Sequence, residues 1–174
     1  KVSPVPAGSL ITSITNSDGV YKTHFGTDSY SILSDKEVTA ETFSSDRVVT
    51  LSAVQTAVGQ HAHANFKVLL IDLVGEEEVM GNWAFLTNEA MNYIVNDLGV
   101  EVVVVNAASV DRESDGGFVP NHKIIFENRH HLVVELAQLS HLEHGQLGTV
   151  LLNIEPHNTY ADCGSSKLEF QPSA

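Results

Sequence analysis

The sequence is short of cysteine, of positive charge and of long apolar runs, and each shortage excludes a class of protein. Cys163 is the only cysteine among 174 residues, so no intramolecular disulfide can form. Nine scattered Lys and Arg face 22 Asp and Glu, a net charge of −13, whereas nucleic acids and anionic membrane surfaces require clustered positive charge. No apolar run approaches the roughly 20 residues of a membrane-spanning helix. We therefore expect no nucleic acid and no membrane as partner.

The rest of the composition is that of an ordinary globular protein. Hydrophobic residues make up 43% and charged residues 18% of the chain, unlike a disordered sequence. The length is typical of one domain, and we find no repeat or linker, so a single domain over 1–174 is predicted. The chain begins at Lys1 rather than Met, which slightly favours a secreted over a cytoplasmic protein and otherwise leaves the compartment open.

The middle of the chain has the pattern of an α/β fold. Residues 66–73 form a nearly continuous apolar run, typical of a strand that is covered on both faces. Residues 87–98 predict a helix, because Thr87 can cap it and apolar residues recur at helical spacing up to Leu98. Residues 100–105 predict a second buried strand. Together they predict one βαβ unit around residues 66–105, within a mixed sheet flanked by helices.

The other segments are shorter. The first thirty residues predict short strands joined by turns, and 35–46 a surface loop. Residues 47–54 are rich in β-forming residues. Further apolar segments cover 122–126, 132–136 and 148–154, with a short helix expected at 137–142 and an edge strand at 167–170. The acidic run 76–78 is interpreted as a solvated loop.

Histidine pairs are frequent, but their spacing points to no site. The pair within 61–63 needs further ligands and is better explained as an exposed loop. The neighbours 130–131 point apart in a strand, and the pair within 141–144 lacks the Glu of a metalloprotease helix. A Cys–His nucleophile pair built on Cys163 stays open, although nothing singles it out.

Residues 24–31 (HFGTDSYS) resemble the signature HxGTHxDxPxH of the metal-dependent cyclase and kynurenine formamidase family, which includes isatin hydrolase-like proteins. The rest of the chain is similar to that family in order. Residues 85–111 resemble its helix–strand segment, Pro120-Asn121-His122 its Pro-Ala-His, and 132–142 its Glu-Asn-Leu-Ala-Asn-Leu segment. The resemblance covers roughly 20–170 and is strongest from 86 to 142.

The resemblance implies a swivelling β/β/α cyclase-like fold and an oligomer. The resemblance also implies that the N-terminal strand region of the family is not included in these residues. Family members are commonly dimers or tetramers, and an uncovered sheet edge invites pairing, so we expect a homo-oligomer. A monodisperse monomer in light scattering would contradict this.

Carried over residue by residue, the resemblance implies a partly eroded metal site. The family's metal ligands match His24, Asp28 in place of a His, His122 and Glu135. Two histidines and two carboxylates could hold a single divalent metal, Zn or Mn. Tyr30 replaces a metal-binding Asp, and Ser34 falls at the position of a His that assists catalysis in the family. The other expectation is a metal-free pocket that contains Tyr30 and Ser34.

Three functions follow as hypotheses. The leading one is a cyclase-fold protein that is non-catalytic and acts as a soluble binding or assembly protein, with a small molecule as possible ligand. The alternative is a metal-dependent hydrolase of an amide, formamide or lactam-like C–N bond. The third is an acidic structural or matrix component, although the acids are dispersed and form no Asp-x-Asp-x-Asp-Gly calcium loop.

Overall fold

The computed structural model describes residues 4–61, 65–74, 83–155 and 163–173, and it is mixed α/β as predicted. Its contacts divide the chain into two compact units, Lys1–Leu139 and Ser140–Ala174, which we describe separately. The single domain stays a prediction. His63 and the acidic run 76–78 lie outside the described residues. Among the helices described, none combines the length and apolar character needed to cross a bilayer.

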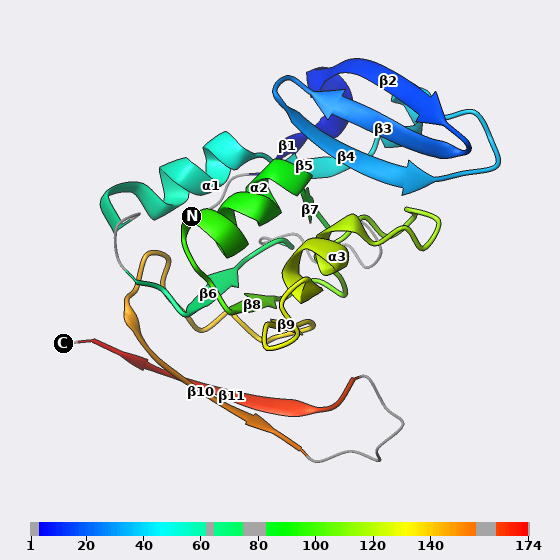
Figure 1. Cartoon of the computed structure of the whole chain (residues 1–174). Helices are drawn as coiled ribbons and strands as arrows, with labels where there is room; N and C mark the ends of the chain where they lie inside the picture. The colour runs from blue at the N-terminus through cyan, green and yellow to red at the C-terminus, as the bar shows by residue number, and fades with distance from the viewer. Residues whose placement is uncertain (1–3, 62–64, 75–82, 156–162, 174) are drawn as a thin grey trace. The chain divides into compact units, whose positions relative to one another are not determined.

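The N-terminal part of the first unit is built of antiparallel strands (Figure 1). Strands β2 (Ile11–Ser17), β3 (Val20–Phe25) and β4 (Asp28–Leu33) form a meander. The β3–β4 turn contains Gly26 at φ 68°, a left-handed conformation that glycine adopts without steric cost. Strand β5 (Arg47–Val49) lies between β1 (Val5–Pro6), antiparallel to it, and β7 (Phe85–Leu86), parallel to it. The strands predicted in the first thirty residues are confirmed.

The second sheet of this unit is parallel. Strand β8 (Val102–Val105) pairs with β6 (Val68–Ile71) on one side and with β9 (Leu132–Val134) on the other. Helix α2 (Asn88–Asn92) lies between β6 and β8 in the chain and continues as a π-helical turn over Tyr93–Asp97. The predicted parallel strands with an intervening helix are thus confirmed. The carboxyl ends of β8 and β9 lead directly into the segments that carry the polar residues discussed below.

Two further helices accompany α2. Helix α1 (Leu51–Val58) and helix α3 (Pro120–Phe126) both contact it (Figure 1). In α3 the proline occupies the first turn, where its missing N–H is not needed. Thr87 caps α2 as expected, since its hydroxyl accepts a hydrogen bond from the Ala90 N–H at 3.2 Å.

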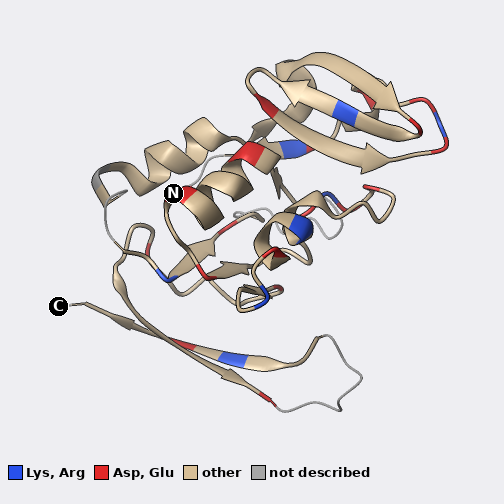
Figure 2. Ribbon diagram, in the orientation of Figure 1, with Lys and Arg blue, Asp and Glu red and all other residues tan. Residues whose placement is uncertain are grey.

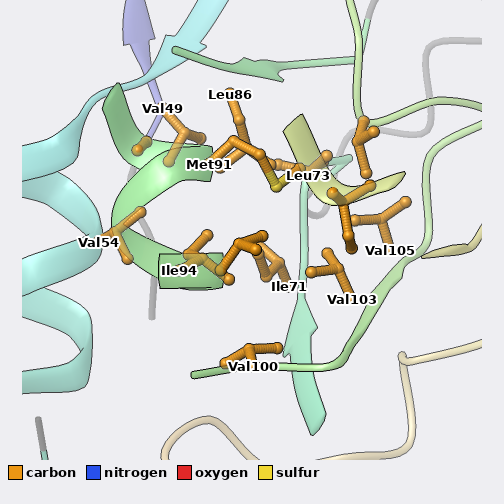
Figure 3. Packing of buried hydrophobic residues seen from close by; sticks show 14 of the residues in the cluster. Val49, Val54, Ile71, Leu73, Leu86, Met91, Ile94, Val100, Val103 and Val105 are labelled. Atoms are coloured by element: carbon orange, nitrogen blue, oxygen red, sulfur yellow. The ribbon is translucent and has the colours of Figure 1, made fainter. Parts of the chain in front are cut away.

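The first unit has two apolar clusters. The larger one gathers α1, α2 and the parallel sheet, with Ile71, Leu73, Met91 and Ile94 buried at its centre (Figure 3). The smaller one lies under the antiparallel strands and contains the fully buried Phe43. Side chains of this size are each worth about 1.5–3 kcal/mol when fully buried. The clusters therefore hold the elements that position the site in place.

The second unit contains a two-stranded antiparallel ribbon. Strand β10 (Gly148–Ile154) pairs with β11 (Ser166–Pro172) along its whole length. The expected edge strand at 167–170 is confirmed within β11.

Three expectations from the sequence differ from the structure. The β-rich segment 47–54 is a strand only to Val49, because the Thr50 hydroxyl caps a helix that starts at Leu51. The surface loop expected at 35–46 includes a 3₁₀ turn, Ala40–Phe43, whose aromatic side chain is buried. The helix expected at 137–142 is not formed. It would follow Leu136, whose left-handed backbone (φ 56°) interrupts the chain direction there.

Candidate functional site

A histidine held between two carboxylates is the centre of the candidate site. His122 lies in the first turn of α3, and its Nδ1 is 2.6 Å from the Asp111 carboxylate. Its Nε2 lies 3.4 Å from Glu135 Oε1. The Asp111 side chain is 1% exposed, whereas those of His122 and Glu135 are 23% and 29% exposed. The solvent-facing part of the site is therefore the Nε2–Glu135 pair, with Asp111 behind it.

Local backbone geometry places these groups. Asp111 follows β8 and Glu135 follows β9, so both lie beyond the carboxyl ends of neighbouring parallel strands, where α/β proteins bind ligands. Before α3, Val119 has a left-handed backbone (φ 41°), a strained conformation for a β-branched residue. The Asp115 carboxylate accepts its N–H at 2.7 Å and stabilises this turn.

Tyr30 belongs to the buried side of the same network. Its hydroxyl donates to Asp111 at 2.8 Å and lies 3.3 Å from Asp115, and it accepts the Arg112 N–H at 2.9 Å. The ring is fully buried and packs against Phe85 with centroids 4.7 Å apart. Burial raises the pKa of the Tyr30 phenol far above its usual range. Tyr30 therefore stays a neutral phenol, which is a poor metal ligand.

Asp28, the second candidate metal ligand, holds the ends of two helices. Its Oδ2 accepts the Leu51 N–H at 2.6 Å and the Thr87 hydroxyl at 2.8 Å. Leu51 opens α1 and Thr87 caps α2, so the buried carboxylate lies at the positive end of both helix dipoles. These contacts give Asp28 a complete structural role.

His24 and Ser34 lie apart from this network. His24 is half-buried on β3, opposite Ser29, which donates its N–H and its hydroxyl to Glu89. The Ser34 hydroxyl accepts the Lys36 N–H at 3.1 Å in the turn after β4. In the described part of the chain, no hydrogen bond or ion pair joins either residue to His122 or Glu135. Of the predicted ligands, the structure brings together His122 and Glu135.

The described residues do not form a complete metal site. Among the described residues, no group of three or more His, Cys, Asp or Glu side chains is arranged to hold an ion. His122 and Glu135 would offer two ligands, whereas protein zinc sites use three or four. The acids of the first unit lie on several separate elements rather than in one cluster (Figure 2).

The site's electrostatics favour a charged imidazole. The hydrogen bond to Asp111 raises the pKa of His122, and partial burial opposes this only in part. Burial raises the pKa of Glu135, and the neighbouring His122 opposes that shift. The imidazole of His122 can bind a proton, and the carboxylates can accept hydrogen bonds from donors. The Nε2 atom of His122 lies on the solvent side.

A cavity of about 260 Å³ adjoins the Tyr30 network. Phe85, which packs on Tyr30, and Arg112, whose N–H bonds to it, both line this cavity, together with Asp46, Trp83 and Glu113. The Arg112 side chain is held by Asp46 at 2.5 Å and by the Thr42 carbonyl at 2.8 Å. The cavity is smaller than the 300–1,000 Å³ of typical ligand pockets, so it suits only a small ligand.

Two carboxylates of the network, Asp111 and Asp115, were not singled out as site residues from the sequence. Both lie in the irregular segment between β8 and α3. A usable signal existed, because this Asp- and Gly-rich loop directly follows a buried strand, where parallel sheets bind ligands. The bonds of Glu89 to Ser29 depend on long-range packing, so the sequence gives no local sign of them.

Comparison with known proteins leaves the family open. No family model, no curated protein and no solved structure matches this chain.

Proposed function

We propose that this chain is a cyclase-like protein that has lost metal-dependent hydrolysis and acts as a non-catalytic binding or assembly protein. One observation carries the proposal: two of the three side chains at altered motif positions, Asp28 and Tyr30, are both used in buried or part-buried hydrogen bonds. A carboxylate committed to two helix ends cannot turn to a metal without leaving their donors unpaired, at about 1–3 kcal/mol each.

The cavity beside Tyr30 is the proposed binding place. Its polar and aromatic lining, in which Glu113 is an acid beside the Asp46–Arg112 ion pair, favours a small ligand that carries hydrogen-bond donors. Because Arg112 is already bonded to Asp46, the cavity offers no free positive charge for an anion.

The test is hydrolysis of an aryl formamide with and without added Zn²⁺ or Mn²⁺. We expect turnover no faster than in protein-free buffer containing the same metal. His122→Ala is compared with His130→Ala, which changes an exposed histidine. Hydrolysis that stops on chelation and is lost in His122→Ala alone would contradict the proposal.

One observation favours the hydrolase as a second candidate. Metal-binding histidines commonly direct their other ring nitrogen to a carboxylate, as His122 does toward Asp111. In that case His122 Nε2 and Glu135 would be the ligands of a zinc or manganese ion, which would supply Lewis-acid chemistry. Asp111 would then orient the imidazole, and the remaining ligands would have to come from outside the network described above.

A further inference from the structure

The cavity beside Tyr30 has two aromatic side chains in its lining, Trp83 and Phe85. Phe85 is 1% exposed and packs against the Tyr30 ring, whereas Trp83 is half-buried. The faces of aromatic rings carry a negative electrostatic potential that attracts cations, and the attraction is strongest at tryptophan. The aromatic part of the lining therefore favours a ligand that combines an apolar body with a positive charge.

The charged side chains of the lining leave one negative charge uncompensated. Asp46 and Arg112 form an ion pair, so their charges cancel. Each of the three Arg112 guanidinium nitrogens already donates a hydrogen bond, to Asp46 or to the carbonyls of Thr42 and Ser114. Among the described residues no cation pairs with Glu113, so its carboxylate gives the cavity a net negative charge.

The size of the cavity limits the ligand further. Its volume is about 260 Å³, below the 300–1,000 Å³ of typical ligand pockets. Such a space suits a single ring with a short amine side chain rather than a nucleotide or a peptide. A small protonated amine meets all three conditions, because it is compact, carries one positive charge and brings hydrogen-bond donors to an acidic lining.

We propose that this cavity binds a small organic cation, namely a protonated amine. Its apolar part lies against Trp83 and Phe85, and its ammonium group faces the Glu113 carboxylate. The inference deepens the proposed function and rests on it, because it names the class of ligand for the binding place proposed above.

The fluorescence of Trp83 tests the proposal directly, because Trp83 is the only tryptophan of the chain and it lines the cavity. The full chain is titrated with benzylammonium chloride, benzyl alcohol and sodium benzoate, which share one ring and differ in charge. We expect the dissociation constant of benzylammonium to be at least about fivefold below that of benzyl alcohol. Benzoate should give no saturable change. N-acetyltryptophanamide, titrated in parallel, corrects for collisional quenching.

Glu113→Gln removes the uncompensated charge and keeps the size of the side chain. Because an exposed ion pair contributes little, we expect benzylammonium to bind roughly two- to fivefold more weakly and benzyl alcohol to bind as before. Glu127→Gln is the matched control, since it changes an exposed glutamate that is not part of the lining. Its constants should equal those of the unchanged chain.

The possible outcomes separate this inference from the proposed function. Binding of benzyl alcohol or benzoate as tight as that of benzylammonium would overturn the inference, and so would an unchanged constant in Glu113→Gln. No saturable change with any of the three compounds would overturn both the inference and the choice of this cavity. The loss of metal-dependent hydrolysis is tested independently of these titrations, by the aryl formamide assay described above.

Discussion

The hydroxyl group of Tyr30 connects β4 with the loop that follows β8. It donates to Asp111 and accepts the Arg112 N–H, so one oxygen satisfies groups from two distant parts of the sequence. An Asp at this position would add a further negative charge beside Asp111 and Asp115. The neutral phenol of Tyr30 avoids this carboxylate repulsion.

Replacing Tyr30 with Phe should lower the free energy of unfolding by about 1–3 kcal/mol, because the buried Arg112 N–H loses its acceptor. Urea denaturation measures this. Tyr21→Phe is the control, since in the described structure no hydrogen bond involves the Tyr21 hydroxyl. Equal stability of the two variants would show that the Tyr30 hydroxyl does not stabilise the fold.

Asp28 can be tested as a structural residue in the absence of any metal. Asp28→Ala leaves the Leu51 N–H and the Thr87 hydroxyl without their shared acceptor. We expect a loss of about 2–3 kcal/mol in chemical denaturation carried out with chelator present. Asp35→Ala, which changes an exposed carboxylate, should have almost no effect. If Asp28 were only a metal ligand, Asp28→Ala would not change the stability of the chelated protein, which would contradict the structural role.

The network of His122 should make stability depend on pH. The pKa of His122 is raised by its bond to Asp111, so its contribution is complete below the unfolded value of about 6.5. It is lost as the pH rises through the raised pKa of the folded protein. The raised pKa of Glu135 acts in the same direction, from a lower pH upward.

The stability difference between the unchanged chain and His122→Gln should therefore be larger near pH 6 than near pH 9. Urea denaturation at both values measures it, with His130→Gln as the control at an exposed position. A difference that grows with pH would mean that the neutral imidazole is the form that folding favours.

At the scale of elements, the start of α2 joins a helix cap to a buried carboxylate. Thr87 accepts the Ala90 N–H and donates to Asp28, whereas Thr50 at the start of α1 accepts the Ala53 N–H and bonds to an exposed serine. Thr87→Ala should lower the free energy of unfolding by about 2 kcal/mol, and Thr50→Ala by about 1 kcal/mol. Thermal or urea denaturation of both variants gives the comparison. A smaller effect at Thr87 would contradict the role assigned to Asp28.

The same elements show what the sequence could predict. The helix at 87–98 and its flanking parallel strands follow from local signals, namely a cap, an apolar stripe and two valine-rich runs. The start of α1 combines a local cap, Thr50, with a bond from Leu51 to Asp28, which is 23 positions away. The β-branched residues around Thr50 favour a strand, so the run 47–54 by itself does not reveal where the helix begins. His122 and Glu135 lie close together because β8 and β9 pair. Asp28 is predicted as a metal ligand from the sequence, but its hydrogen-bond partners lie at the starts of two helices.

At the scale of the whole molecule, the groups that a metal catalyst would need are divided between two tasks. Asp28 and Tyr30 stabilise the packing of the antiparallel strands against helices and loops. His122 and Glu135 face solvent at the carboxyl ends of the parallel strands. This division supports the proposed function, in which a cyclase-like fold acts without metal catalysis.

The most direct test of this claim is elemental analysis of the protein purified without added metal or chelator. The account predicts far less than one Zn or Mn per chain, and no stoichiometric uptake when either metal is added. About one firmly bound ion per chain, lost in His122→Ala, would contradict it and make the hydrolase the better explanation of the site.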